Sequence, residues 1–305
     1  MLQEVFYWVF NMSITAAITG VFVMLARLVP KIPRRLTVLL WLVPFFRMTV
    51  PFGLNSPYSL MSLLAGITTK TVVVFKPTDD VSFSMMNSVR AADSYFPITY
   101  KVNLLDQIFN IASIIWIIVF LAIILLLAVI YFTTLHEMKD AKYLRDNIFL
   151  SDKALSPAVY GIVKPKIILP TAYADKDIEL VLLHEKIHIS RADNMWRVIA
   201  LLIVAAHWFN PLSWVFYKLF LTDIELSCDE SVLVKTGSVR AKEYALLLLK
   251  SKESTNVCAS EFGGTTKIRT RIENILFFKK MTCFSLIVSF ALFAAIFYVL
   301  LTNAG

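Results

Sequence analysis

The sequence predicts a mainly α-helical integral membrane protein, in which four apolar helices accompany one polar domain with a small β element. Three observations support this fold class. Of the 305 residues, 58% are hydrophobic and 17% are charged, whereas a soluble domain is about half apolar and about a quarter charged. The apolar residues gather in long runs, and one long stretch between them is much more polar. This composition excludes an ordinary soluble domain and a disordered chain, and three cysteines are too few for a disulfide scaffold.

Four apolar runs are long enough to be membrane spans, which need about 20 residues. They are Val5–Val29, Leu36–Leu54, Ile108–Phe132 and Cys283–Thr302. The third and fourth runs contain no charged residue. The second is interrupted by Pro44, Arg47 and Pro51, and an arginine in a bilayer is costly unless it snorkels or faces protein. The alternative for the second run is a helix that packs on its neighbours at the membrane surface.

The charges beside the first run predict the orientation of the chain. The start is acidic, at Glu4, unlike the basic start of a cleavable signal peptide, so we expect the first run to remain as a span. Basic residues follow it at Arg27, Lys31, Arg34 and Arg35. The positive-inside rule places this turn in the cytoplasm. Both termini are then expected outside the cell membrane.

This topology divides the chain into five segments. They are residues 1–54 with two helices and a short cytoplasmic turn, an extracytoplasmic segment 55–107, a third helix 108–132, a cytoplasmic domain 133–281, and a fourth helix with a short outer tail 282–305. We attribute the net charge of +8 to this topology and to attraction by anionic membrane lipid. The basic residues form no recognition helix and stand beside no aromatic stacking motif, so direct nucleic-acid binding is not expected.

The polar domain contains the pattern H-E-x-x-H, at His184, Glu185 and His188. The run Asp177–Val198 has no proline or glycine and predicts a helix with Asp177 at its start. Residues i and i+4 share one helix face, so both imidazoles can hold one Zn²⁺ ion at about 2.0–2.1 Å. Glu185 would take a proton from the attacking water and deliver it to the leaving amine. The alternative, a packed core pair of histidines, does not explain the glutamate.

A catalytic zinc ion needs a third protein ligand, and Glu225 is the candidate. The stretch Leu212–Lys235 is long enough for a helix, with Gly237 as its stop signal. Asp229 stands four residues after Glu225, on the same helix face, and could bond the distal N–H of a zinc histidine. Two acids at this spacing could also be a solvated helix face. Cys228 is a softer zinc candidate, and we expect it to be a small packed residue instead.

The apolar stretch Ile199–Leu221 could pass for a fifth span, but Asn210-Pro211 lies near its middle. Proline interrupts helical hydrogen bonding, and the residue before it leaves helical space. We therefore expect two helices that meet there, and that either dip into the inner leaflet or lie on it. A crossing would put His184 and Glu225 on opposite sides of the membrane, so the zinc hypothesis requires the chain to return.

The stretch Ser156–Pro170 predicts two short strands around a turn, because β-branched and apolar residues lie between Pro and Gly. A strand edge beside the zinc helix could hold an extended peptide by backbone hydrogen bonds. The alternative is an ordinary small hairpin that serves only as a scaffold.

Four motifs together carry a family resemblance. They are His184-Glu185-x-x-His188, Arg191-x-Asp193-Asn194-x-Trp196, His207-Trp208-Phe209-Asn210-Pro211 and Glu225-Leu226-Ser227-Cys228-Asp229-Glu230. With the four apolar runs, they make the chain resemble the BlaR/MecR-type antirepressor family of membrane zinc metallopeptidases. The resemblance implies a gluzincin-like zinc domain on the cytoplasmic face, with His184, His188 and Glu225 as zinc ligands and Glu185 as the catalytic residue. Asp229 and Asp193 are expected to contact these ligands without binding the metal themselves.

The resemblance also implies a role. Such proteins sense an outside signal, cleave themselves and inactivate a cytoplasmic repressor of transcription, so we expect a cytoplasmic protein substrate. The polar segment Glu253–Lys267, with Gly263-Gly264, is the candidate for self-cleavage. The antibiotic-sensing members carry an extracellular penicillin-binding domain after the fourth span, whereas this sequence stops at Gly305. The outside signal would then be read by residues 55–107, by the spans, or by a partner, either a second copy or a separate sensor. The alternative for residues 55–107 is a connector with no receptor function.

Two other classes of function stay open at this stage. One is a non-enzymatic membrane signal transducer with a structural zinc site. The other is a purely structural assembly protein of the membrane. Metal content, together with proteolytic activity of the wild type and of Glu185→Ala, would distinguish the three.

Overall fold

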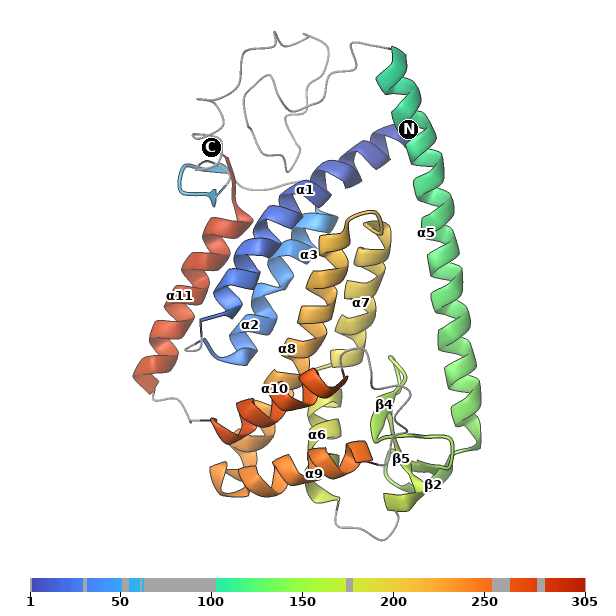
Figure 1. Cartoon of the computed structure of the whole chain (residues 1–305), viewed down its shortest axis with the longest axis vertical. Coiled ribbons are helices and arrows are strands. Elements are labelled where there is room, and N and C mark those ends of the chain that lie inside the picture. The colour runs from blue at the N-terminus through green and yellow to red at the C-terminus, as the bar shows by residue number, and fades with distance from the viewer. Residues whose placement is uncertain are drawn as a thin grey trace. The chain divides into compact units, whose positions relative to one another are not determined.

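The computed structural model describes residues 2–29, 32–50, 55–60, 62, 103–173, 178–253, 264–278 and 283–304. The chain forms two compact units (Figure 1). The first contains residues 1–124, 200–219 and 283–305, and the second contains residues 125–199 and 220–282. Most of the segment 55–107 and of the candidate self-cleavage segment lies outside the described residues.

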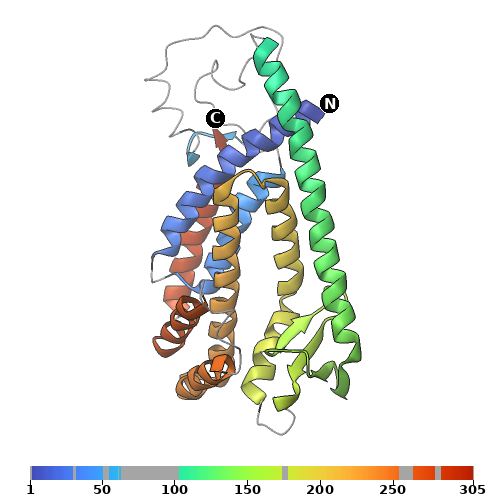
Figure 2. The same cartoon turned by 45° about the vertical axis from the view of Figure 1, so that its right-hand side comes forward.

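The first unit consists mainly of apolar helices. They are α1 (Leu2–Arg27), α2 (Arg34–Leu40), α3 (Leu42–Thr49), the first part of α5 (Asn103–Glu137) and α11 (Cys283–Leu301). Helix α3 packs along α1, and α11 lies beside α2 and α3 (Figures 1 and 2). Among the described residues, two helices are long and apolar enough to cross a membrane, Leu2–Arg27 and Ile108–Asp140, and Ile287–Leu301 is a shorter apolar helix. The first and third predicted runs are thus long apolar helices.

The second predicted run is two short helices instead of one long span. Helices α2 and α3 are separated at Trp41, and α3 ends at Thr49. The break has a covalent cause, since Pro44 has no N–H to donate to the carbonyl of Leu40 and its ring crowds that carbonyl. Val50 is extended, with φ −111° and ψ 113°, as expected for the residue before a proline.

Arg47 of α3 is fully buried and faces protein. Its Nε and Nη2 donate to the carbonyl oxygen of Leu300 at 3.1 and 3.0 Å, and Nη2 also donates to that of Thr302. These carbonyls stand at the C-terminal end of α11, where a helix has no internal donors left. Beside them, β1 (Asn55–Ser56) pairs in parallel with β6 (Asn303–Ala304). The arginine therefore ties α3 to the end of α11.

The predicted break at Asn210-Pro211 is confirmed. Helix α7 covers Asp193–Ala206 and α8 covers Pro211–Thr236. The side chain of Asn210 accepts from the Leu212 amide at 3.0 Å and donates to Ser13 Oγ of α1 at 2.8 Å. The Nε1 of Trp116 on α5 donates to the carbonyl of Ala206 at 2.8 Å. Within the first unit, the turn between α7 and α8 is thus bonded to both α1 and α5.

The second unit contains a sheet of four strands in the order β2-β3-β5-β4. The strands are β2 (Lys142–Arg145), β3 (Ile148–Ser151), β4 (Ala158–Tyr160) and β5 (Lys166–Pro170). The predicted hairpin is confirmed as the antiparallel pair β4 and β5, and its turn contains Gly161 with a positive φ of 89°, which favours glycine. Strands β2 and β3 were not predicted. Strand β4 lies at one edge of this sheet, and no strand among the described residues pairs with its outer side.

The prediction of one helix over Asp177–Val198 is wrong. Helix α6 covers Glu179–Ser190, and α7 begins at Asp193. Between them, Ala192 has a φ of +53°, a left-handed conformation that ends a helix. An alanine rarely adopts it, so the sequence contains no breaker at this point. The turn lets the side chain of Asp193 contact His188.

Four helices of the second unit share one apolar core. Helices α9 (Ala241–Glu253) and α10 (Gly264–Leu276) pack against each other and join α6 and the second half of α8. The core residues are Leu180, Ile187, Cys228, Val232, Leu233, Ala241, Tyr244, Ala245 and Ile275. Full burial of one such aliphatic side chain stabilises a fold by about 1.5–3 kcal/mol. This packing brings α8, α9 and α10 against the helix that carries H-E-x-x-H. The predicted stop at Gly237 is confirmed, since α8 ends at Thr236 and Gly237 has a φ of +83°.

Candidate metal centre

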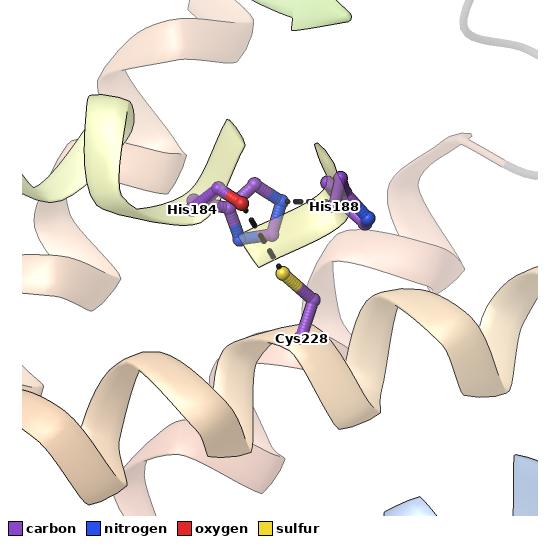
Figure 3. A group of neighbouring side chains, drawn as sticks. All are labelled: His184, His188 and Cys228. Carbon is purple, nitrogen blue, oxygen red and sulfur yellow. Dashed lines mark hydrogen bonds between the residues drawn. The ribbon is translucent and has the colours of Figure 1, made fainter. Parts of the chain in front are cut away.

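Helix α6 places the two histidines side by side, one turn apart (Figure 3). Both are buried, with 7% of His184 and 6% of His188 exposed. Their Nε2 atoms face each other at 3.1 Å, and the ring planes are nearly perpendicular, at 88°. The two rings therefore present one nitrogen each to a single point.

The other nitrogen of each ring has a defined partner. His188 Nδ1 lies 2.6 Å from Asp193 Oδ2, and Asp193 Oδ1 accepts from Arg191 Nε at 3.2 Å. His184 Nδ1 lies 2.8 Å from the hydroxyl of Tyr244, which donates to Asp229 Oδ1 at 2.6 Å. A carboxylate only accepts hydrogen bonds, so His188 donates through Nδ1. The Tyr244 hydroxyl donates its single proton to Asp229 and can only accept from His184. His184 therefore also donates through Nδ1.

Both Nε2 atoms are consequently left as acceptors. Two acceptor lone pairs at 3.1 Å repel each other unless a proton or a cation lies between them. The surroundings favour that positive charge. Burial lowers the pKa of His188, but the hydrogen bonds with Asp193 and Cys228 together outweigh burial and raise the pKa to about 9. Burial also opposes charge on His184, but Cys228 and Glu225 raise its pKa well above the usual range.

Helix α8 supplies the third candidate ligand, Glu225. Its Oε2 lies 3.6 Å from His184 Nε2, and its Oε1 lies 3.6 Å from His188 Nε2. Ligands about 2.1 Å from a tetrahedral zinc ion are about 3.4 Å from one another, which agrees with the 3.1 and 3.6 Å separations. The three side chains therefore fit one small cation with nitrogen and oxygen ligands.

Two arginines also contact Glu225. Arg197 Nη2 donates to Oε1 at 2.6 Å, and Arg271 Nη1 lies 3.2 Å from Oε2. Burial would raise the pKa of Glu225, but the hydrogen bond with His184 and the charge of Arg271 hold it well below its usual range. The carboxylate is thus ionised, as a metal ligand must be.

Cys228 lies closer to the histidines than the sequence indicated. Its sulfur and one nitrogen of each histidine all lie within 4.8 Å of one another. However, the thiol projects from α8 toward the backbone oxygen of His184, to which it donates at 3.4 Å (Figure 3). The residue is fully buried within the apolar core. Both facts favour Glu225 over Cys228 as the third ligand.

Asp229 lies behind His184, but not in direct contact with its ring. Its Oδ1 is 3.5 Å from His184 Nδ1, and the Tyr244 hydroxyl bonds to both atoms. Arg271 donates to Asp229 through Nε and Nη2, each at 2.8 Å. Burial and the charge of Asp229 raise the pKa of Tyr244 well above its usual range, so the hydroxyl keeps its proton. Asp193, in contrast, contacts His188 directly.

Glu185 lines a cavity of about 340 Å³ together with the three candidate ligands. It follows His184 on α6 and is 7% exposed. One wall of the cavity consists of residues 156–159, at the start of the edge strand β4. Other lining residues are Tyr173, Val181, Asn194, Arg197, Tyr244, Leu247, Leu248, Ile268 and Arg271. The cavity gives a ligand access to the metal-binding atoms.

Sequence reasoning missed three polar residues of the site, Tyr244, Arg197 and Arg271. Arg197 had a detectable signal, because it stands four residues after Asp193 and so shares its helix face. Tyr244 and Arg271 lie on α9 and α10, in stretches without a motif. Only the packing of these helices against α6 and α8 brings the two side chains to the site.

A buried histidine pair on one helix, a carboxylate from a second helix and an adjoining glutamate define a helical protein of the metallopeptidase class. The comparison with known families agrees, since the profile described as BlaR1 peptidase M56 matches residues 7–275. The chain belongs to this family, which confirms the resemblance carried by the motifs.

Several characterised proteins are similar to parts of the chain. Regulatory protein BlaR1 of Bacillus licheniformis is 32% identical over 155 residues, which cover 47% of this chain and 26% of the relative. Methicillin resistance mecR1 protein of Staphylococcus aureus is 31% identical over 136 residues, 41% of this chain and 23% of the relative. Regulatory protein BlaR1 of Staphylococcus aureus is 24% identical over 221 residues, 62% and 37% of the two chains. The chain thus spans about a quarter of the length of the first two relatives.

Proposed function

We propose that this chain is a membrane zinc endopeptidase that acts in signal transduction by hydrolysing a cytoplasmic protein. One observation carries the proposal: two imidazole acceptors lie 3.1 Å apart, and each is 3.6 Å from one of the two carboxylate oxygens of Glu225. Zn²⁺ would be held by His184, His188 and Glu225. Their nitrogen and oxygen atoms suit zinc, and three protein ligands leave a position free, as a catalytic site requires.

When bound, the zinc ion supplies a Lewis acid for amide hydrolysis. Residues of the chain itself would carry the proton transfer and orient the ligands. Glu185 accepts the proton of the attacking water on its carboxylate and delivers it to the leaving amine. Asp193 keeps His188 as the Nδ1–H donor, with Nε2 directed to the metal, and the Tyr244 hydroxyl does the same for His184.

The edge strand β4 is the proposed binding surface for the substrate backbone. Asn194 Nδ2 donates to the carbonyl of Val159 at 2.8 Å, so this carbonyl points away from β5. In an antiparallel strand the N–H of the same residue points the same way. The Val159 N–H and the neighbouring carbonyl of Pro157 are therefore available to an extended peptide. A second wall of the cavity, with Leu247, Leu248 and Ile268, suits an apolar side chain of that peptide.

In the proposed topology, four spans place both termini outside and the active site on the cytoplasmic face. The two long apolar helices and the basic residues after Arg27 support it. The turn between α7 and α8 would return the chain, so that His184 and Glu225 stay on one side. Whether this turn dips into the inner leaflet can be tested by labelling cysteines placed at Trp208 and Trp214.

The proposed substrate is a cytoplasmic repressor of transcription. The names of the relatives, regulatory protein BlaR1 and methicillin resistance mecR1 protein, support a regulatory role. Self-cleavage within Glu253–Lys267 is a further part of the proposal. The outside signal would reach the peptidase through a second copy of the chain or through a separate sensor.

Substitution of Glu185 tests the catalytic role, because this residue is not a metal ligand. The purified Glu185→Ala variant should keep the zinc content of the wild type and lose proteolysis of the substrate. Lys186→Ala is the matched control, since Lys186 is the exposed neighbour on the same helix, and it should retain activity. Proteolysis by Glu185→Ala would refute the catalytic role. Bound zinc without proteolysis in the wild type would favour the signal transducer with a structural zinc site.

A further inference from the structure

The two histidines of the site are supported in different ways. Behind His188 stands the pair Asp193 and Arg191, with the carboxylate 2.6 Å from the ring. Behind His184 stands a similar pair, Asp229 and Arg271, but its nearest carboxylate oxygen is 3.5 Å from the ring. This distance is too long for a good hydrogen bond. The hydroxyl of Tyr244 bridges it, at 2.8 Å from His184 Nδ1 and 2.6 Å from Asp229 Oδ1.

The direction of the hydrogen bonds along this chain follows from its far end. An arginine is a donor only, and Arg271 donates to both oxygens of Asp229 at 2.8 Å. Asp229 has no exposed surface, and a buried carboxylate needs such a partner to remain charged. As an ionised group it only accepts, so the single proton of the Tyr244 hydroxyl is committed to it. The hydroxyl oxygen then has only lone pairs to offer His184.

We propose that Tyr244 is a positioning residue for the metal centre, and that Arg271, Asp229 and Tyr244 form a relay that holds His184 as the Nδ1–H tautomer. Only this tautomer leaves Nε2 free to bind a metal ion. The relay makes α9 and α10 part of the metal centre, although neither supplies a ligand. This inference rests on the proposed function, in which His184 is a zinc ligand.

Tyr244→Phe is the direct test, because it removes the bridging hydroxyl and keeps the ring in the core. The affinity of the metal-free full chain for Zn²⁺ should fall about 10- to 100-fold, the range for residues that orient metal ligands. Tyr143→Phe is the control, since Tyr143 is 67% exposed on β2, and its affinity should equal that of the wild type. A Zn²⁺ affinity of Tyr244→Phe within twofold of the wild type would overturn the proposal.

A second measurement does not depend on metal binding. Nitrogen NMR of the metal-free chain, labelled with ¹⁵N-histidine and recorded at alkaline pH, reports which ring nitrogen carries the proton. His184 should be the Nδ1–H tautomer in the wild type and a mixture in Tyr244→Phe. Arg271→Gln should also shift the tautomer, because it removes both guanidinium donors that hold Asp229 against the Tyr244 hydroxyl. The control Arg269→Gln should not, since Arg269 is exposed on the same helix.

The two readouts separate the relay from the proposed function. If the wild type shows the Nδ1–H tautomer that Tyr244→Phe loses, but binds no zinc at His184, the relay stands and the zinc peptidase fails. If the wild type binds zinc but His184 keeps the same tautomer in Tyr244→Phe and Arg271→Gln, the relay is wrong and the proposed function stands.

Discussion

The hydrogen bond between His188 and Asp193 makes the stability of the metal-free protein depend on pH. Burial lowers the pKa of His188, but Asp193 and, to a smaller extent, Cys228 raise it from 6.5 to about 9 in the folded state. In the unfolded chain it returns to about 6.5. Below pH about 6.5 both states are protonated, and the full stabilisation is present. As the pH rises toward 9 the unfolded state loses its proton first, so the stabilisation declines and is lost above the folded pKa.

The size of this effect follows from the two pKa values. Their difference, multiplied by 1.36 kcal/mol per pKa unit, is about 3 kcal/mol. Asp193→Asn removes the ionised partner and with it the largest of the interactions that raise the pKa of His188. The free energy of unfolding of Asp193→Asn should therefore be lower than that of the wild type at pH 6, and the gap should narrow by up to about 3 kcal/mol between pH 6 and 9.5.

Thermal unfolding of the detergent-solubilised protein in the presence of a chelator measures this gap. Asp140→Asn is the control, because Asp140 is an exposed carboxylate, 79% accessible, that forms an ion pair with Lys153. The difference in the free energy of unfolding between Asp140→Asn and the wild type should stay small and constant over the same pH range. Zinc-saturated wild type should show the opposite trend, since protons compete with zinc for the imidazoles. A gap between wild type and Asp193→Asn that is constant or widens with pH would refute the reasoning.

Three further predictions concern single residues. Ala192→Gly should stabilise the protein by about 1 kcal/mol in thermal unfolding, because it relieves a φ of +53°. Arg47→Leu should destabilise it by about 2–3 kcal/mol in denaturant titration, since two carbonyls lose a charged donor. Glu225→Gln should weaken Zn²⁺ binding more than about 100-fold in calorimetry, beyond the loss typical of residues behind the ligands. An unchanged stability or Zn²⁺ affinity in any of these three variants would contradict the structural reason given for it.

Features that depend on neighbours in sequence could be predicted. The spacing of His184 and His188 places both rings on one helix face whatever the surroundings, and Asn210-Pro211 interrupts a helix by its covalent structure. Pro44 has the same kind of effect, but the prediction gave more weight to the apolar length of the run that contains it. The break at Ala192 could not be predicted, since an alanine adopts its left-handed conformation here only because the surrounding structure imposes it.

Features that depend on packing between distant segments could not be predicted. Strands β2 and β3 are four residues each, too short for a hydrophobic period to identify them. Asp229 was expected to bond the distal N–H of a zinc histidine, whereas the group that contacts His184 Nδ1 in the structure is the Tyr244 hydroxyl. The distance of 3.5 Å between Asp229 Oδ1 and His184 Nδ1 depends on how α8 and α9 pack against α6. No local sequence pattern encodes this packing.

The charges around the site explain why its polar residues form one group. It contains four carboxylates and three guanidinium groups: Glu185, Asp193, Glu225 and Asp229, with Arg191, Arg197 and Arg271. Once the imidazoles have given up their protons, as metal binding requires, the ionised carboxylates leave a sum of −1, which favours a cation. A divalent ion changes it to +1, which suits the negative charge that develops on a scissile carbonyl oxygen. If one of the three arginines were absent, the occupied site would be neutral. If a fourth were present, the site without the metal ion would be neutral and would no longer attract a cation. The number of arginines is therefore as much a requirement of the proposed chemistry as the ligands themselves.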